Sequence, residues 1–331
     1  MKKWVKYQLD HKELTLPFLI KPCTQILNCS VNDLIHNSSL QAQGMYEISK
    51  RYPMSASLGI MDLSVEAEEF GAEVKYYNDE VPIIDSPMIA NIEEVEKLIV
   101  PKVGTKRTKV YIEGIKKAKE LIIDRPIFSN VTGPFTVCSL LIGLNINSIN
   151  GESEKFIHII LNKVTEFLIN YVLAFKEAGV DGVVISEPFA GFLSLKLCDE
   201  FSSKYVKKIK EAVDDENFIF IYHNCGNVIP ILDSIISIGA DIYHFGNAID
   251  IHEVLKKVGS DIVVMGNIDP ILFKCGTKKS ITNEVNRLFN ENANYPNYII
   301  SSGCDIPATS KNENIQSYFD AIRANYKKQK L

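Results

Sequence analysis

The strongest constraint on the fold is a unit that recurs along the chain: a short apolar run rich in β-branched residues, a polar tip, and an amphipathic helical stretch. Two examples are "GVDGVVISEP" (Gly179–Pro188) and "NFIFIYHNCG" (Asn217–Gly226). Such runs are almost continuously hydrophobic, which is typical of parallel strands buried on both faces, and the preceding helices end near Gly or Asn. The pattern therefore predicts an α/β protein with a parallel sheet.

The number of these units favours a closed barrel. Seven polar tips are visible, and an eighth strand is expected around Val81–Ile84. Eight βα units fill about 250 residues, so a single-domain (β/α)8 TIM barrel fits the chain better than two domains. We expect residues 1–45 to form an N-terminal extension packed on the barrel, and residues 46–331 to form the barrel. A doubly wound sheet is the alternative, but no glycine-rich dinucleotide-binding motif follows any predicted strand.

Composition restricts the classes of partner. The chain is 46% hydrophobic with a formal net charge of -5, and this mild acidity argues against nucleic-acid binding, which is normally marked by a clustered basic face. The most apolar early segment, Leu14–Leu27, is interrupted by Pro17, Lys21 and Pro22, so no membrane span is expected. Seven scattered cysteines do not suggest a disulfide framework. We therefore expect a reduced, cytoplasmic protein.

The polar tips are the candidate functional residues, because reactive groups of a (β/α)8 barrel lie at the C-terminal ends of its strands. These tips are Asp62, Asn130, Glu187, His223 with Cys225, His244, Asn267 with Asp269, and Cys304 with Asp305. His223 and Cys225 alternate at a strand end, so both side chains can point the same way. Cys304, at the end of the last predicted strand, is the best candidate for a third metal ligand.

A set of one histidine and two cysteines is known from catalytic zinc sites, which keep a fourth position open for water or substrate. Thiolate ligands favour zinc over magnesium or calcium. Two thiolates and a neutral imidazole cancel the charge of Zn²⁺, and such a site suits alkyl transfer to a substrate thiol. The alternative is that the His-x-Cys pattern arose by chance and that the cysteines are small buried hydrophobes.

The chain resembles the uroporphyrinogen decarboxylase superfamily, and within it the methylcobamide:coenzyme M methyltransferases. The resemblance spans the chain from about Ile60 to the C-terminus and rests on "GPFTVCSLLIG", "GVDGVVISEPFAG", "HNCGNVIPILDSI", "GNIDP" and "SSGCDIPATSKNENI". It implies a (β/α)8 barrel whose zinc motif falls on His223, Cys225 and Cys304. It further implies methyl transfer between a methyl-corrinoid (cobalamin) carried by a partner protein and a small acceptor, such as the thiol of coenzyme M.

The chain departs from both groups of relatives at particular positions. The paired arginines by which the decarboxylases hold substrate carboxylates are missing from Arg51–Asp62, so decarboxylation of a porphyrinogen ranks below methyl transfer. The acidic residue that follows the zinc motif in the coenzyme M enzymes is replaced by Gly246 and Asn247. The fourth zinc ligand and the methyl acceptor therefore stay open, and tetrahydrofolate is an alternative acceptor.

Three further residues are candidates for the site. Glu187 is a candidate catalytic residue, as a resting ligand or proton acceptor, and its alternative role is that of a carboxylate at a helix N-terminus. Asp62 and Asn267 are candidates for binding substrate, although each could instead cap the following helix. The expected partners are a corrinoid protein and a small methyl acceptor, with no nucleic acid or membrane, and the expected state is a monomer or homodimer. A barrel that binds a corrinoid or tetrapyrrole without turnover is the non-enzymatic alternative.

Overall fold

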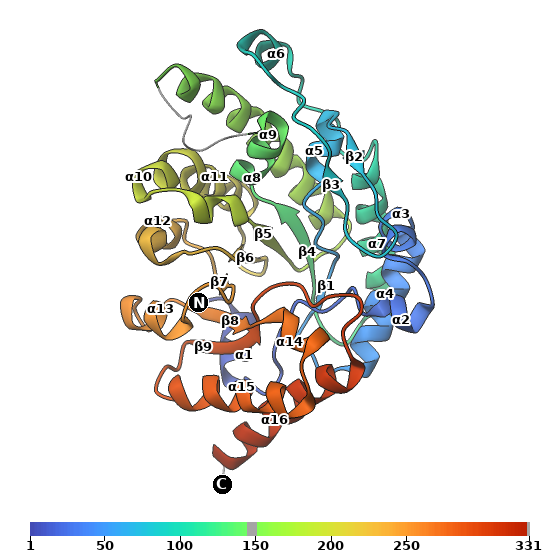
Figure 1. Ribbon diagram of the computed structural model, residues 1–331, viewed down its shortest axis with the longest axis vertical. Helices are drawn as coiled ribbons and strands as arrows, with labels where there is room; N and C mark the ends of the chain where they lie inside the picture. The colour runs from blue at the N-terminus through green and yellow to red at the C-terminus, as the bar shows by residue number, and fades with distance from the viewer. Residues whose placement is uncertain (144–150, 330–331) are drawn as a thin grey trace.

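The computed structural model describes residues 1–143 and 151–329, which form one curled parallel sheet with helices around it (Figure 1). Within these residues, seven strands follow one another in the order β1-β4-β5-β6-β7-β8-β9, and every neighbouring pair is parallel. They are β1 (Ser57–Leu58), β4 (Ile127–Thr132), β5 (Gly182–Ser186), β6 (Ile219–Asn224), β7 (Ile242–Phe245), β8 (Val264–Ile268) and β9 (Tyr298–Ser302). The predicted α/β fold with a barrel-like parallel sheet is confirmed.

Helices connect successive strands and cover the outside of the sheet (Figure 1). The N-terminal helices are α1 (Lys3–Asp10), α2 (Cys23–Leu27), α3 (Val31–His36) and α4 (Ser38–Arg51). The later helices are α5 (Val65–Phe70), α6 (Ile92–Lys97), α7 (Arg107–Leu121), α8 (Pro134–Ile142), α9 (Gly151–Glu177), α10 (Leu195–Cys198), α11 (Lys204–Val213), α12 (Leu232–Ile236), α13 (Ile251–Lys257), α14 (Pro270–Cys275), α15 (Lys278–Glu291) and α16 (Asn312–Gln329). Short 3-10 or π turns are η2 (Pro188–Phe192), η3 (Asp199–Ser203) and η4 (Ile229–Ile231).

Helix α9 illustrates how the apolar pattern is used. Its buried residues Ile157, Leu161, Val164 and Leu168 recur at three-and-four spacing and form a stripe, and the helix packs against α8 and α11. Among the described helices, its part Glu154–Glu177 is long and apolar enough to cross a membrane by length and composition, but half of its most apolar window is buried inside the protein. Core packing therefore accounts for the apolar character of this helix.

The eighth strand expected around Val81–Ile84 is not part of the parallel sheet, and this prediction was wrong. β3 (Ile83–Ile84) pairs antiparallel with β2 (Val74–Lys75) in a separate two-stranded sheet. The apolar side chains of this segment line the cavity described below. An apolar run at a cavity wall resembles a buried strand in sequence, because both consist of consecutive apolar residues.

An extended segment near the N-terminus lies between the first and last strands of the sheet. Ser301 Oγ in β9 donates a hydrogen bond to Leu16 O at 2.7 Å. On the other side, Ser55 N, just before β1, donates to Thr15 O at 3.1 Å. The segment around Thr15 and Leu16 therefore bridges the two edges of the sheet.

The apolar residues of the strands divide between two clusters. Val184 belongs to an inner cluster together with Leu16 and Phe18, whereas its neighbours Val183 and Ile185 belong to the larger cluster that packs against the helices. This division follows from the alternation of side chains along a strand. Because the inside of the sheet is a packed core, chemistry is left to the loops at the C-terminal ends of the strands.

The N-terminal residues pack on the sheet at two places. Val5 in α1 joins the inner cluster, and Lys2 forms an ion pair with Asp241 at 2.9 Å. Helix α4 packs against α7. Residue 45 lies within α4, and the division of the chain into residues 1–45 and 46–331 stays a prediction.

Candidate metal centre

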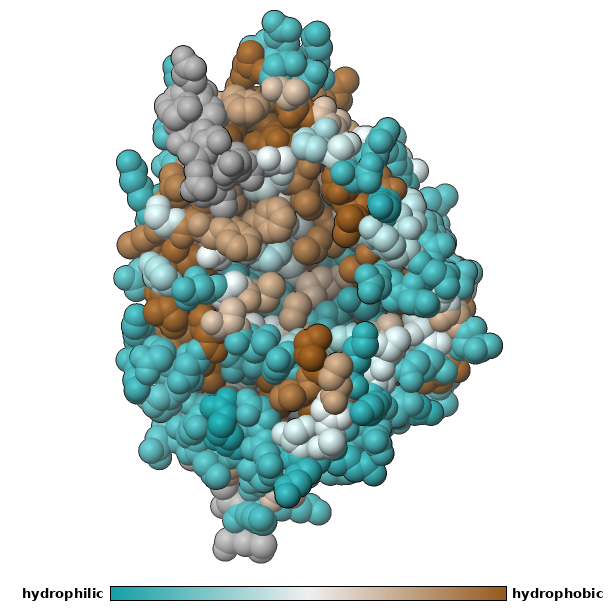
Figure 2. Space-filling view, in the orientation of Figure 1, coloured by the Kyte–Doolittle hydropathy of each residue, from teal (hydrophilic) through white to brown (hydrophobic). Residues whose placement is uncertain are grey.

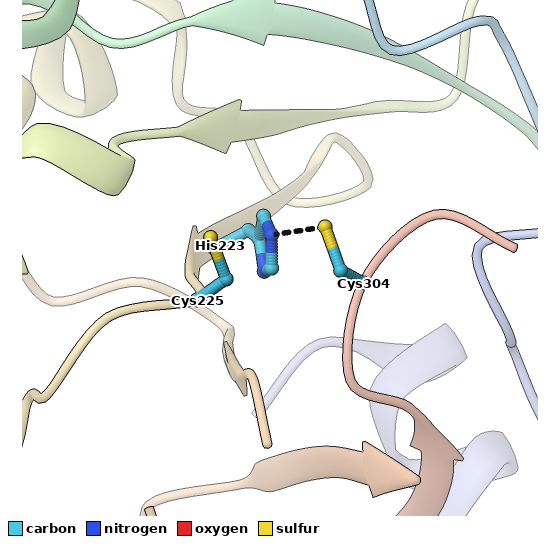
Figure 3. Close-up of side chains that lie close together, drawn as sticks. All are labelled: His223, Cys225 and Cys304. Carbon is cyan, nitrogen blue, oxygen red and sulfur yellow. Dashed lines mark hydrogen bonds between the residues drawn. The ribbon is translucent and has the colours of Figure 1, made fainter. Parts of the chain in front are cut away.

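Three potential metal ligands converge at the C-terminal ends of β6 and β9 (Figure 3). His223 lies in β6, Cys225 directly follows it, and Cys304 follows β9. One ligand atom from each of these residues lies within 4.8 Å of the other two. His223 Nε2 is 3.6 Å from Cys304 Sγ. The structure therefore brings together the three residues that the sequence pattern singled out.

Asn224 holds the turn that carries His223 and Cys225. Its Nδ2 donates a hydrogen bond to Glu187 O at 2.6 Å, and its Oδ1 accepts one from Gly226 N at 2.8 Å. Its side chain thus bonds to the loop after β5 and to its own turn. The residues on either side of it are then free to present their side chains in the other direction.

Gly246, just after β7, lies directly against Cys225. A Cβ at this position would be 2.6 Å from the Cα of Cys225, so no larger residue fits without moving one of the two loops. Asn267 secures the same loop, because its Nδ2 donates to Gly246 O at 3.0 Å and to Ile249 O at 2.8 Å. Tight packing of neighbouring loops therefore fixes the position of Cys225.

His244 lies beside His223 and decides which nitrogen of His223 faces the cysteines. His244 Nε2 is 2.8 Å from Ser302 O, and a carbonyl oxygen only accepts hydrogen bonds, so Nε2 carries a proton. Burial, together with the neighbouring His223, lowers the pKa of His244 well below its ordinary value, so the ring is neutral and its Nδ1 accepts. The Nδ1–H of His223 donates to it at 2.7 Å. Nε2 of His223 is then left with a lone pair on the side of Cys304.

We predict that His244→Ala weakens zinc binding about 10–100-fold, the usual cost of losing the partner of a ligating histidine. The imidazole of His223 would lose the acceptor that fixes its tautomer and orientation. Zinc affinity can be measured by competition with a chromophoric chelator. His244→Gln, whose amide oxygen can accept from His223, should recover part of the loss, and His36→Ala at an exposed position should change nothing. Unchanged affinity in His244→Ala would contradict this role.

The pKa values of the two cysteines are shifted in opposite directions. The pKa of Cys225 is lowered, chiefly because Cys304 donates a hydrogen bond to its thiolate. The pKa of Cys304 is raised well above its ordinary value, because its thiol donates that bond and because burial disfavours a second thiolate. A divalent cation would stabilise both thiolates and displace the proton of the Cys304 thiol.

The donor set fits zinc in kind, and the distance between one sulfur and the imidazole nitrogen fits the spacing of a zinc shell. In a tetrahedral shell with Zn–S of about 2.3 Å and Zn–N of about 2.0–2.1 Å, a sulfur and a nitrogen ligand lie roughly 3.5–3.6 Å apart. The distance between Cys304 Sγ and His223 Nε2 is 3.6 Å. Two sulfurs and one imidazole nitrogen also match the preference of zinc over harder cations.

A cavity of about 410 Å³ opens beside the three ligands. Much of its wall is apolar, including Met61, Val81–Ile84 and Phe189, and Lys21 and Asp305 also line it as an ion pair 3.0 Å apart. Figure 2 shows hydrophobic residues around the centre and upper part of one face of the molecule, with hydrophilic residues over its lower edge. A cavity of this size suits a small molecule.

The role of Lys21 was missed by the sequence analysis, which recorded it only as an interruption of an apolar segment. Its place beside Asp305 follows from the N-terminal segment that lies between β9 and β1. Nearby in that segment, Phe18 stacks on His244 with ring centroids 4.1 Å apart. Two side chains of the N-terminal segment thus reach the site.

Glu187 does not line the cavity with the three ligands. Its carboxylate accepts hydrogen bonds from Phe135 N at 3.0 Å and Thr136 N at 2.6 Å, in the first turn of α8. Burial raises its pKa to about 7. It therefore caps α8, and its role as a ligand or proton acceptor stays a prediction that these contacts do not support.

The side chains of Asp62 and Asn267 are engaged within the protein. Asp62 forms a buried ion pair with Arg107 and accepts hydrogen bonds from Tyr111 Oη at 2.9 Å and Ser64 N at 3.0 Å. The amide nitrogen of Asn267 holds the loop after β7, as described above. Their substrate-binding roles stay predictions, and the observed contacts are structural.

Comparisons with known proteins agree with this fold. A family model described as uroporphyrinogen decarboxylase (URO-D) matches residues 18–325. The chain is 24% identical over 282 residues to the methylcobamide:CoM methyltransferase MtbA of Methanosarcina acetivorans, which covers 80% of this chain and 78% of that protein. It is 26% identical over 302 residues to the uroporphyrinogen decarboxylase of Protochlamydia amoebophila, which covers 88% of this chain and 80% of the relative.

Among solved structures, a methyltransferase from Methanosarcina mazei superposes with a TM-score of 0.82 at 22% sequence identity, covering 95% of this chain and 93% of the other. The family model spans all three candidate ligands and the whole of the sheet. The family predicted from the sequence is thus confirmed, and its matched members include both methyltransferases and decarboxylases. The chain belongs to the uroporphyrinogen decarboxylase family.

Proposed function

We propose that the protein is a zinc-dependent methyltransferase that moves a methyl group between a methyl-corrinoid on a partner protein and a small thiol acceptor. The observation that carries this proposal is the convergence of His223, Cys225 and Cys304 within 4.8 Å beside a largely apolar cavity. When bound, zinc would lower the pKa of a thiol ligand and so supply a thiolate nucleophile at neutral pH. The similarity to a methylcobamide:CoM methyltransferase is in line with methyl transfer, and the donor set and the apolar cavity favour it over decarboxylation.

The residues of the chain would contribute binding, orientation and exclusion of water. His223, Cys225 and Cys304 would hold the metal, and His244 would keep Nε2 of His223 available as a ligand. The apolar wall of the cavity keeps water away from a reacting sulfur, which strengthens electrostatic interactions there.

Exposed apolar side chains near the cavity favour docking of a partner protein. Ile83 lines the cavity and is 50% exposed, and Phe192 and Ile271, in segments that follow β5 and β8, are 72% and 54% exposed. The C-terminal ends of parallel strands lie on one face, so these residues and the ligands share that face. An apolar face of this kind suits a partner that presents a methyl-corrinoid.

Decarboxylation of a porphyrinogen is less well supported, although decarboxylases match at similar identity. Among the described residues that line the cavity, Lys21 is the single cation, and it is paired with Asp305. A substrate with several carboxylates needs several basic partners. A folate acceptor carries a carboxylate tail, which would likewise lack a free basic partner among these cavity residues.

The proposal is tested by incubating the zinc-loaded protein with methylcobalamin and a thiol while the absorbance of cobalt(I) is followed. We expect formation of cobalt(I) together with the methyl thioether, and neither product with zinc-free protein. Release of carbon dioxide from a porphyrinogen, without methyl transfer to any thiol, would favour the decarboxylase alternative. A cytoplasmic location and a monomeric or homodimeric state stay part of the proposal.

A further inference from the structure

We propose that the cavity selects a neutral thiol with a short apolar body over an anionic thiol, and that Asp305 determines this specificity. The inference rests on the proposed function, in which a thiol is the methyl acceptor. It narrows the acceptor to a chemical class that excludes sulfonates and carboxylates.

The wall of the cavity offers an apolar surface. Met61 and Phe189 contribute to it, together with Val81–Ile84 from the segment that carries β3. Removing a methylene group of a ligand from water against such a surface raises its affinity about 4-fold per CH₂. An apolar body next to the sulfur would therefore add to the affinity.

The hydroxyl groups of the wall are already engaged. Ser64 Oγ donates to Asp62 at 2.7 Å and accepts from Arg107 at 2.8 Å. Ser186 Oγ donates to the sulfur of Met61 at 3.3 Å. Neither group is available to stabilise a charged substituent without giving up a protein contact.

The ion pair in the wall has no surplus positive charge. Lys21 Nζ lies 3.0 Å from Asp305 Oδ2, and the two side chains are only 16% and 5% exposed. Both carboxylate oxygens of Asp305 are buried and accept no hydrogen bond, so Lys21 is the group that offsets their charge. An anionic group entering the cavity would compete with Asp305 for Lys21 and would be repelled at short range and low dielectric by the Asp305 carboxylate. A neutral ligand meets neither penalty.

The first test uses the unaltered, zinc-loaded protein and isothermal titration calorimetry. The ligands are propane-1-thiol, 2-mercaptoethanesulfonate, and 2-(methylsulfonyl)ethanethiol, which is an uncharged analogue of the sulfonate. We expect propane-1-thiol to bind at least about 10-fold more tightly than the sulfonate, with the uncharged sulfone between them. This order separates the effect of charge from that of polarity.

The second test uses Asp305→Asn, which keeps the size of the side chain and releases Lys21 from its carboxylate partner. We expect the affinity for 2-mercaptoethanesulfonate to rise at least about 10-fold, while the affinity for propane-1-thiol changes less than about 3-fold. Zinc content is measured in parallel, because Asp305 adjoins Cys304. If this variant fails to fold or to hold zinc, Lys21→Met provides an effect of opposite sign: weaker binding of the sulfonate and unchanged binding of propane-1-thiol.

The outcomes separate this inference from the proposed function. Binding of the sulfonate as tightly as propane-1-thiol to the unaltered protein would overturn the inference and leave a thiol methyltransferase standing. If the ratio of the affinities for 2-mercaptoethanesulfonate and propane-1-thiol is unchanged in zinc-loaded Asp305→Asn, the inference is likewise overturned and the proposed methyltransferase stands. Failure of every thiol to bind the zinc-loaded protein would overturn the proposed function, and the inference with it.

Discussion

Cys304→Ala is expected to lose zinc and, with it, methyl transfer. Zinc-finger peptides bind zinc through four ligands with about 10–16 kcal/mol, or roughly 2.5–4 kcal/mol per ligand. Loss of one ligand therefore corresponds to about 100–1000-fold in affinity. Zinc per chain, measured by atomic emission after dialysis, should fall from one to near zero. Turnover of methylcobalamin with a thiol should fall below detection, because no nucleophile is activated.

The exposed Cys275 supplies the matched control for this experiment. Cys275→Ala removes a thiol from the last residue of α14 and should leave zinc content and turnover unchanged. Cys304 lies in a loop after β9, so its replacement should also leave the circular dichroism spectrum unaltered. Retention of one zinc per chain with unchanged affinity in Cys304→Ala would refute the assignment of Cys304 as a ligand.

Arg107→Met is expected to destabilise the protein by about 3–5 kcal/mol, the usual cost of leaving one partner of a buried ion pair unpaired. Arg107 forms ion pairs with Asp62 and with Glu68, the latter at 2.6 Å, and these side chains are 5%, 0% and 14% exposed. Without the guanidinium, Asp62 would be buried next to Glu68 with no opposing charge. The free energy of unfolding is measured from urea denaturation followed by circular dichroism.

Arg287→Met provides the comparison for an exposed arginine. Arg287 also contacts two carboxylates, Glu284 at 2.6 Å and Glu291, but its side chain is 45% exposed. Water already solvates these charges, so the same substitution should cost less than about 1 kcal/mol. Equal losses for the two variants would show that burial of the Asp62 pair contributes nothing to stability.

The fold was predictable because its signal is local. Parallel strands buried on both faces require consecutive apolar residues, as in Val183, Val184 and Ile185, and those runs are readable without knowing what packs against them. The wrong prediction of an eighth strand at Val81–Ile84 arose from the same local signal, a run of consecutive apolar residues. A cavity wall also needs consecutive apolar side chains, so sequence pattern could not distinguish the two environments.

The convergence of the three candidate ligands was predictable because each is tied to the end of a strand. Topology places the ends of parallel strands at one face, so His223, Cys225 and Cys304 could be grouped before their distances were known. Glu187 satisfies the same rule, yet its carboxylate is bound to the first turn of α8. A position at a strand end therefore predicts the face, but the neighbours of the side chain decide its role.

The linear order of residues was sufficient for the seven strands of the parallel sheet and for grouping the three candidate ligands, because periodicity and strand ends are properties of short segments. The pairing of Lys21 with Asp305 and the contact between His223 and His244 required the folded chain. Lys21 and Asp305 are far apart in sequence, and no local pattern records which side chain stands opposite another after the barrel closes. Their proximity, and the specificity inferred from it, depend on the N-terminal segment that lies between β9 and β1.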